Sequence, residues 1–521
     1  MKIIYHEIKK IWNWKILLIL VAICVLYYSM FMQFYSYTWT DPWPGTHRNN
    51  ISMQLKERYG LTLTPEQVEA FIIETEIALT AELEGIIKSM SVFSEAGVYN
   101  IEDYAALFTI DEPTDAEWKA MYVFESSEAD WVGIAVSTFI TFRNAWDLYV
   151  SNLLRDTVEM YNWRVDFYHG LLKSNDRVMY IQNIEAELLA EADIFILQTP
   201  KITERGIKNY EEFWEYMAKL DPNSFFGRDW SLLFQTLNSP SSGFIDDRIA
   251  EIGRSFYMID RYPEQALNRA VRDYLRDMEG WSTNSFWLSR INEIIDTGEY
   301  LNIISEVAQQ RTFGYISQIY IMILLAVLAL VSPYLATDRM RRVHHLQYVS
   351  KMGRKLMYQQ LASVLLSSFV LTTIILAVTL ALFFNATDVL IWREHGIVSF
   401  MGYFTTIIPF TFGGYIILMV SLAYLVSFGV AFLAFIISRF SRYVMTATFK
   451  AVPTYIALMF LFGFIFGGGG DSSERLLTFG NVIYRFTGIP GIELILLVFL
   501  MLLGLGATLW TTKREQRVDV V

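Results

Sequence analysis

Residues that could do chemistry are few in this 521-residue chain, and the clearest candidates lie beside long apolar stretches. Glu493 opens the last of these stretches, and Arg475 and Arg485 lie shortly before it. An ionisable residue beside a membrane helix is a candidate for a transport pathway or an outer gate. Glu493 has a second interpretation, because a carboxylate at a helix N-terminus is electrostatically favoured. The two arginines could face a polar substrate or lie in a solvated loop.

The motifs of common catalytic and nucleotide-binding sites are absent from the sequence. It contains no His-Glu-x-x-His and no Gly-x-Ser-x-Gly, and His344-His345 has no third metal ligand at a useful spacing. The four glycines at 467–470 resemble a phosphate loop, but no Gly-Lys-(Ser/Thr) follows them. We therefore predict that the chain is not an enzyme and that it has no catalytic residue, metal site or cofactor of its own.

The apolar stretches that flank these residues place the chain in the membrane class. Hydrophobic residues make up 53% of the sequence, and runs of about 18 or more apolar residues are long enough to cross a bilayer. The first run lacks a cleavage site and is too long for a signal peptide, so we expect a retained anchor. The predicted spans are 16–34, 317–336, 360–384, 415–438, 451–466 and 492–510.

Charge predicts how these spans are oriented. Residues 36–310 contain 45 acidic and 22 basic residues, whereas the rest of the chain contains 9 acidic and 20 basic ones. Placing both termini in the cytoplasm leaves 16 basic residues inside and only Arg393, Arg475 and Arg485 in the short outer loops, which satisfies the positive-inside rule. The acidic insert between the first two spans is then extracytoplasmic, and its charge excludes nucleic acid as a partner.

The insert carries the signatures of a helical domain. Helix starts are predicted at Thr64-Pro65, at Thr114 and at Pro263-Glu264 from their capping and first-turn residues. Breaks are predicted at Pro200, Pro222-Asn223, 238–243 and 296–298, and the apolar run 131–142 is predicted to be a core helix because it is too short to span a membrane. The only cysteine, Cys24, lies outside the insert, which favours a bacterial surface of the Gram-positive type.

One stretch admits two topologies. Residues 396–438 contain no formal charge over 43 positions, which is enough for two spans. Two spans would move Arg439, Arg442 and Lys450 outside, against the positive-inside rule. We predict one span preceded by a segment, at about 397–412, that dips into the membrane or lies on it.

Two basic segments are predicted on the cytoplasmic side. Residues 1–15 place Ile4, Ile8, Ile11 and Trp12 on one helical stripe, which is typical of a helix lying in the membrane interface, although a plain positive flank is the alternative. The loop at 337–359 either only enforces topology or binds a cytoplasmic partner. Its candidate docking residues are Asp338, Arg339, Arg341, Arg342, Tyr348, Ser350, Lys351, Gly353, Arg354 and Lys355.

This arrangement resembles the permease subunits of type-2 ABC transporters. Those begin with an amphipathic elbow helix, which Tyr5-His6-Glu7-Ile8-Lys9-Lys10-Ile11 matches loosely, and have a cytoplasmic coupling helix between the second and third of six spans. In the coupling-helix pattern, Asp338-Arg339 stands for Glu-Arg, Ser350 for the hydroxyl residue and Gly353-Arg354 for the final pair. Val343-His344 replaces a Gly-(Thr/Ser) pair, and the family's proline is missing.

The resemblance covers roughly 1–35 and 313–521 and implies an all-α membrane protein. Its parts are an elbow helix at 1–15 with Glu7, Lys9 and Lys10, a first span at 16–34, an extracytoplasmic domain at 35–312 and five further spans at 313–521. It implies a multi-pass permease of the cell membrane, an exporter, that works with a second permease subunit, identical or homologous, and with a cytoplasmic ATPase subunit that binds ATP and Mg²⁺. The alternatives are a membrane-anchored sensor and an envelope enzyme. The sequence offers no output domain for the sensor and no site for the enzyme.

Overall fold

The computed structural model describes residues 2–37, 44–107, 110, 113–126, 130–155, 158–219, 233, 235–237, 240–282, 285–341, 343, 356–400, 405–466, 476–479 and 481–517. Within these ranges every regular element is a helix, joined by a few isolated β-bridges, so the all-α fold class is confirmed. The chain divides into two compact units. We call Met1–Asn49 with Ile304–Val521 the membrane unit, and Asn50–Ile303 the insert unit.

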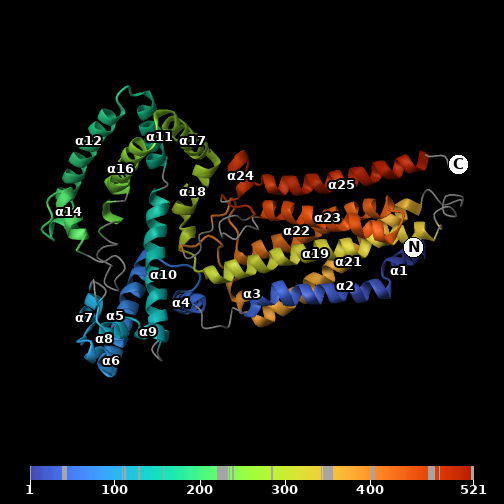
Figure 1. Ribbon diagram of the computed structural model, residues 1–521, viewed down its shortest axis with the longest axis horizontal. Coiled ribbons are helices and arrows are strands. Elements are labelled where there is room, and N and C mark those ends of the chain that lie inside the picture. The colour runs from blue at the N-terminus through green and yellow to red at the C-terminus, as the bar shows by residue number, and fades with distance from the viewer. Residues whose placement is uncertain are drawn as a thin grey trace. The chain divides into compact units, whose positions relative to one another are not determined.

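The membrane unit contains the six predicted spans. The described residues form six helices that are long and apolar enough to cross a membrane, namely Trp14–Ser36, Val307–Met340, Leu356–Ala386, Phe412–Arg439, Val444–Gly463 and Ile492–Arg514. The first span is α2 (Trp14–Tyr27), a π-helical turn (Tyr28–Met32) and α3 (Gln33–Tyr37); the others are α19 (Glu306–Met340), α21 (Leu356–Ala386), α22 (Phe412–Arg439), α23 (Val444–Phe466) and α25 (Ile492–Arg517). They run side by side, with the start of α2 and the end of α25 at the same end of the unit (Figure 1).

The second span is longer than the hydropathy pattern predicts. We expected 317–336, but α19 begins eleven residues earlier because polar residues of its first turns are buried against neighbouring segments. Gln309 is 1% exposed, and its Nε2 donates to the backbone oxygen of Ile397 at 2.7 Å. A buried polar group with a partner costs little, so composition alone underestimates this helix.

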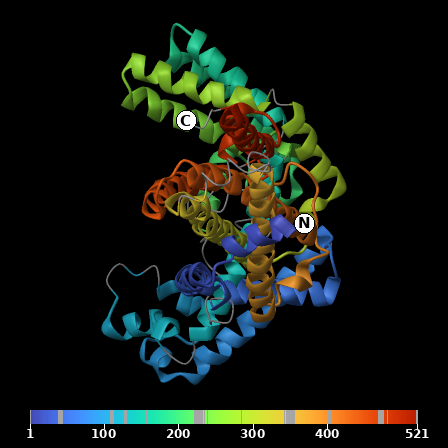
Figure 2. The ribbon, with the colours of Figure 1, turned by 90° about the vertical axis from the view of Figure 1, so that its right-hand side faces the viewer.

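Helix α19 forms the core of the membrane unit. It packs against α2, α21, α22 and α23, which lie around it in the end-on view (Figure 2). Over its most apolar window 78% of the residues are buried, compared with 6% for α23 and 17% for the first span. The middle of the bundle is therefore filled by a helix, whereas the outer helices expose apolar faces suited to lipid or to another chain.

The uncharged stretch 396–438 contains one span and not two. Helix α22 begins at Phe412, where the Thr411 hydroxyl accepts from the backbone N–H of Gly414 at 3.1 Å and caps the helix. Before it, the chain is irregular, with isolated bridges that join Gly396 to Thr411 and Thr406 to Thr478. The two-span alternative is therefore wrong, because the described residues between Gly396 and the Thr411 cap do not form a helix. That the preceding segment dips into the membrane stays a prediction, and 401–404 lie outside the described residues.

The insert unit is helical, as its local signals predict. Its helices are α4 (Pro44–Tyr59, whose start belongs to the membrane unit), α5 (Pro65–Ser89), α6 (Ser91–Glu95), α7 (Ile101–Leu107), α8 (Asp115–Met121), α9 (Val123–Ser126), α10 (Asp130–Arg155), α11 (Val158–Lys173), α12 (Arg177–Gln198), α13 (Pro200–Thr203), α14 (Tyr210–Met217), α16 (Ile245–Arg261), α17 (Glu264–Ser282) and α18 (Ser285–Thr297). Short 3-10 helices lie at Pro240–Ser242 and Glu299–Leu301.

The predicted helix boundaries of this unit are largely confirmed. Thr64 and Thr114 each form a capping box, with Gln67 and Glu117 respectively. The hydrogen bonds that Glu117 accepts from the backbone and hydroxyl of Thr114 lower the pKa of its carboxyl. The run 131–142 lies inside α10, where Val132, Phe139 and Phe142 are buried. The predicted breaks at Pro222-Asn223 and at 238–239 lie outside the described residues.

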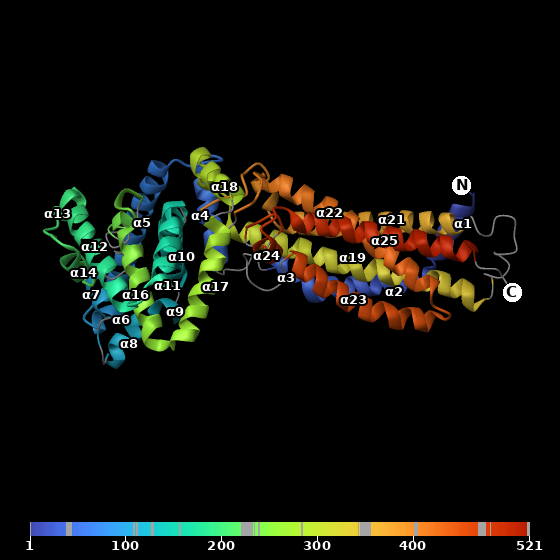
Figure 3. The ribbon, with the colours of Figure 1, turned by 90° about the horizontal axis from the view of Figure 1, so that it is seen from above.

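A buried polar cluster fixes α11 against α16. The four helices α11, α12, α16 and α17 pack around a shared apolar cluster (Figure 3). At its edge Glu251 is 1% exposed and accepts the Tyr168 hydroxyl at 2.6 Å, while Arg164 Nε lies 3.3 Å from its other oxygen. Burial together with the neighbouring Glu251 charge raises the pKa of Tyr168. Without the Tyr168 hydroxyl, this buried Glu251 oxygen would keep only the longer contact with Arg254, at 3.4 Å.

Tyr168→Phe is therefore expected to lower the free energy of unfolding of the insert unit by about 1 kcal/mol. Tyr257→Phe is the matched control, because Tyr257 lies on α16 and is 56% exposed. Thermal unfolding of the full chain, followed by a probe in the insert unit, measures both variants. Equal effects would contradict the assignment of Tyr168 to the Glu251 cluster.

Candidate functional site

The sequence-predicted elbow and coupling residues meet at one end of the membrane unit. Helix α1 (Lys2–Ile11) precedes α2 and is separated from it by the N-cap Asn13. Lys10 Nζ lies 3.0 Å from Glu7 Oε1 and 3.1 Å from Asp338 Oδ2, and the Tyr334 hydroxyl donates to the other oxygen of Glu7. We call Glu7, Lys10, Tyr334 and Asp338 the α1 anchor. It joins positions that are more than 320 residues apart.

Charge and burial explain why the anchor holds. The side chains of Glu7 and Asp338 are 6% and 12% exposed, so each carboxylate gains from a cation at hydrogen-bond distance. Burial alone would lower the pKa of Lys10, but the hydrogen bonds and charges of Glu7 and Asp338 outweigh burial and raise it. Because the folded pKa lies above the unfolded value, this stabilisation is complete below pH 10.5 and is lost only as the pH rises through the folded pKa.

The last turns of α19 contain a proline and are hydrogen-bonded to α22. Pro333 lies inside α19 and cannot donate a backbone hydrogen bond. Two residues later the backbone N–H of Leu335 donates to Ser438 Oγ of α22 at 2.8 Å, and Ser438 is fully buried. Tyr334, the residue before Leu335, and Asp338, one turn later, are four residues apart and therefore share a helix face. The last turns of α19 are thus attached to α1 on one side and to α22 on the other.

Helix α1 also contacts the first turns of α21. It packs along α21, and Ser363 Oγ lies 3.4 Å from the backbone oxygen of Ile4. Ile11 is fully buried, whereas Tyr5 and Lys9 are exposed, so the helix has a packed face and an open face. The end of α19 and the start of α21 flank the basic loop. Helix α1 therefore contacts the two helices on either side of that loop, α19 and α21. We call this end of the unit, which also holds the C-terminal end of α25, the basic end.

The predicted docking residues lie on or just beyond this assembly. Asp338 and Arg339 belong to the last turn of α19, and Arg341 is its exposed C-cap residue. Arg342, Tyr348, Ser350, Lys351, Gly353, Arg354 and Lys355 lie outside the described residues. Sequence reasoning missed Tyr334 and Ser438, because their partners are on other helices and only the Tyr334–Asp338 spacing offered a signal.

Glu493 lies at the opposite end of the unit and is fully buried. Its Oε1 accepts from the backbone N–H of Leu477 at 2.6 Å, and its Oε2 has no hydrogen-bond partner among the described residues. Leu477 has a φ of 55°, a left-handed conformation that is costly for a leucine. Glu493 thus holds a strained turn in place. That Glu493 belongs to a transport pathway or an outer gate stays a prediction.

Further hydrogen bonds close this opposite end. The backbone N–H of Ile407 donates to the oxygen of Leu477 at 2.8 Å, and the Tyr415 hydroxyl donates to the oxygen of Leu476 at 2.7 Å. We call the described residues 395–400, 405–412 and 476–479 the end cap. Arg485 follows on α24 (Val482–Thr487), but its side chain lies outside the description, as do Arg475 and the glycines at 467–470.

Clusters of metal ligands are not found in the described part of the chain: no group of three or more His, Cys, Asp or Glu side chains could hold an ion there. No protein-family model, no curated protein and no solved structure matches the chain.

Proposed function

We propose that this chain is the membrane-spanning permease subunit of an ATP-driven transporter, an exporter, and that a separate cytoplasmic subunit hydrolyses ATP. The α1 anchor carries this proposal. A motor that pushes on the loop between α19 and α21 needs a stiff connection to the spans, and the ion pairs of Lys10 supply one. The basic end is then cytoplasmic, and the insert unit is extracytoplasmic.

The chain's own residues support separate subunits for ATP hydrolysis and for the membrane pathway. The sequence has no Gly-x-x-x-x-Gly-Lys-(Ser/Thr), so ATP and Mg²⁺ would bind to the partner and not to this chain. Because α19 fills the middle of the bundle, a pathway for substrate would form between this chain and a second permease subunit. The apolar faces of α23 and α25 are open to lipid or to such a subunit.

The acidic insert unit would meet substrate or cell wall at the outer surface. Its excess of carboxylates favours cationic partners by simple attraction, and Arg475, Arg485 and Glu493 would lie at the same outer side. Labelling of the insert from outside intact cells tests this topology.

Charge reversal of the basic loop is expected to release the ATPase. In detergent extracts of native membranes, the tagged chain should bring down an ATP-binding protein. The variant that carries Arg341→Glu, Arg342→Glu, Arg354→Glu and Lys355→Glu should lose it by roughly tenfold or more, because docked charges are reversed. The control reverses four basic residues of the same end but outside the loop: Lys9, Arg442, Lys450 and Lys513.

The control should retain the partner because its four changes lie outside the loop. It is matched to the loop variant because the two proteins have the same net charge. Intact folding is checked by thermal unfolding of both proteins. Equal loss in loop variant and control would show non-specific electrostatics, and a folded wild type with no ATP-binding partner would refute the permease assignment.

A further inference from the structure

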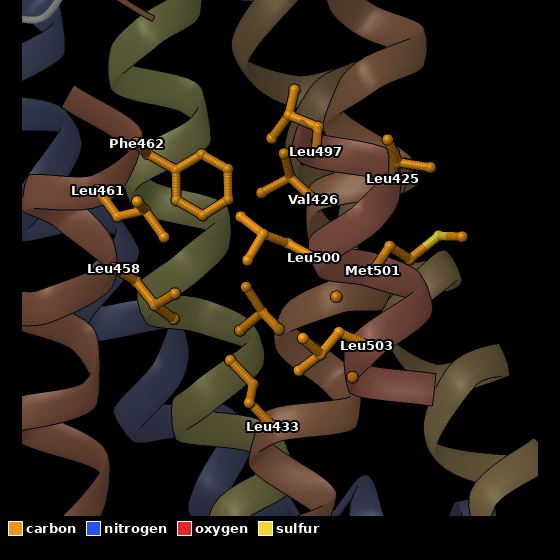
Figure 4. Close-up of a pocket in the computed structure, with 13 residues that line it drawn as sticks. Leu425, Val426, Leu433, Leu458, Leu461, Phe462, Leu497, Leu500, Met501 and Leu503 are labelled. Carbon is orange, nitrogen blue, oxygen red and sulfur yellow. The ribbon is translucent and has the colours of Figure 1, made fainter. Parts of the chain in front are cut away.

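A narrow apolar crevice opens in the membrane unit between α22, α23 and α25. Its volume is about 100 Å³, and each of the 13 residues that line it is apolar. Figure 4 shows Val426, Phe462 and Leu500 pointing into it from the three helices. Since all three helices are predicted to span the membrane, this crevice faces hydrocarbon and not water.

Two glycines shape the crevice. A Cβ on Gly504 would lie 3.3 Å from Phe432 Cβ and 3.8 Å from the Gly429 oxygen, so α25 approaches α22 closely at this point. A Cβ on Gly429 would meet only Met501 Cα, at 4.0 Å. Residue 429 therefore leaves room that a larger side chain would fill. A void lined only by apolar atoms stays dry and favours an apolar occupant.

The size of the crevice restricts that occupant. Pockets for small-molecule ligands usually exceed about 300 Å³ and contain a few placed polar groups, and this crevice meets neither condition. It is too narrow for a helix of another protein, whose diameter with side chains is about 10 Å. A single hydrocarbon chain has the required width and polarity.

Basic side chains lie at one end of the same three helices. They indicate that the hydrocarbon chain belongs to a lipid with an anionic headgroup. Arg442 lies at the turn between α22 and α23, and Lys450 lies in the second turn of α23, where its Nζ donates to the backbone oxygen of Phe440 at 2.9 Å. Lys513 and Arg514 lie near the end of α25, and all four side chains are exposed. Tyr443 and Trp510, 50% and 62% exposed, accompany them, as aromatic side chains do at the headgroup level. Basic clusters between membrane helices bind anionic headgroups, whereas a second copy would bring like charges to this rim.

The separation of rim and crevice fits a lipid. Leu458 is eight residues from Lys450 along α23, which is about 12 Å, and Leu503 is ten residues from Lys513 along α25, about 15 Å. Half of the hydrocarbon core of a bilayer is also about 15 Å. A headgroup at the basic rim would therefore place the end of its acyl chain in the crevice.

We propose that the crevice and its basic rim form a binding site for an anionic glycerophospholipid of the adjoining leaflet. The acyl chain occupies the crevice, and Arg442, Lys450, Lys513 and Arg514 attract the phosphate. The site is independent of the transport function, because it requires no partner subunit and no ATP.

Photo-crosslinking tests the site with the full chain in nanodiscs. The probes are phosphatidylglycerol and phosphatidylcholine with a diazirine at the end of one acyl chain, each tested at the same mole fraction. Crosslinks are expected at 425–433, 458–462 and 497–504. Phosphatidylglycerol is expected to give about fivefold more product there than phosphatidylcholine, which is the effect of one basic residue near an anionic lipid.

Matched variants separate the two parts of the site. Gly429→Leu should abolish crosslinks at 497–504, whereas Gly506→Leu on α25, where an added Cβ meets nothing within 4 Å, should leave them unchanged. The combined change Arg442→Gln, Lys450→Gln, Lys513→Gln and Arg514→Gln should bring the two lipids to equal yield without moving the crosslinked positions.

The crosslinked positions and yields of the wild-type protein are enough to contradict the proposal. The test therefore does not depend on whether the variants fold. Labelling spread evenly over exposed apolar positions of α2, α23 and α25 would show a bulk-lipid surface. Equal yields from the two lipids in the wild type would remove the headgroup site. Protein–protein crosslinks between copies through α23, with no lipid product in the crevice, would show that a second copy covers it.

Discussion

Lys10→Glu is expected to detach α1 from α19. The substitution replaces the cation shared by Glu7 and Asp338 with a third carboxylate, at atom distances near 3 Å in the native structure. Because Lys10 keeps 40% of its side chain exposed, solvent screens part of this effect. We expect the docked state of α1 to lose about 3 kcal/mol, which is roughly a hundredfold change in its population.

Distances between two spin labels measure this docking. With Cys24→Ser as background, labels at position 5 on α1 and position 358 on α21 report the separation, and both native side chains there are exposed. The wild type should give one narrow distribution, and Lys10→Glu a broad one. Lys9→Glu is the matched control, because Lys9 is the exposed neighbour on the same helix and should leave the distribution narrow.

A charge exchange makes the test specific. Lys10→Glu combined with Asp338→Lys again places one cation between two carboxylates, so it should restore the narrow distribution. Broad distributions in the exchange variant and in Lys9→Glu would mean that α1 is held by packing of residues such as Ile11 and not by the anchor's charges.

Glu493→Ala is expected to cost about 2–3 kcal/mol of stability, because it leaves the buried backbone N–H of Leu477 without an acceptor and opens a cavity. The strained φ of Leu477 would then lose its support, and the end cap should loosen. Glu493→Gln retains an oxygen that can accept from the same N–H, so it should keep most of the stability. This pair of variants separates the hydrogen bond from the charge.

Thermal unfolding in detergent and hydrogen exchange measure the effect. The Leu477 amide should exchange faster in Glu493→Ala, and it should stay protected in Glu493→Gln. Equal protection in wild type and Glu493→Ala would contradict the structural role of Glu493. Loss of stability that is as large in Glu493→Gln as in Glu493→Ala would show that the acceptor geometry of the carboxylate is essential.

Local signals explain what the sequence could predict. Six apolar stretches predict six long helices because hydropathy and length act on each segment independently. The capping residues Thr64 and Thr114 predict helix starts for the same reason, since a cap bonds only to the next turn. One span in 396–438 follows from the charges that flank it. None of these features needs a partner from elsewhere in the chain.

The remaining features depend on distant partners. The early start of α19 requires Ile397 to accept from Gln309, and the role of Glu493 requires the turn at Leu477. The sequence pattern predicts the elbow residues Glu7 and Lys10. It does not predict Tyr334, whose contact with Glu7 depends on the packing of α1 against α19. A single sequence does not indicate such pairs, because their spacing along the chain has no period.

Cross-linking of the native complex tests the central claim most directly. Native membranes containing the tagged chain are treated with a lysine-reactive cross-linker, and the linked peptides are identified by mass spectrometry. The permease proposal predicts links from Lys351 and Lys355, the two lysines of the basic loop, to a cytoplasmic protein with an ATP-binding motif. A folded chain whose loop lysines link to no ATP-binding protein, in cells that express all of its natural partners, would contradict it.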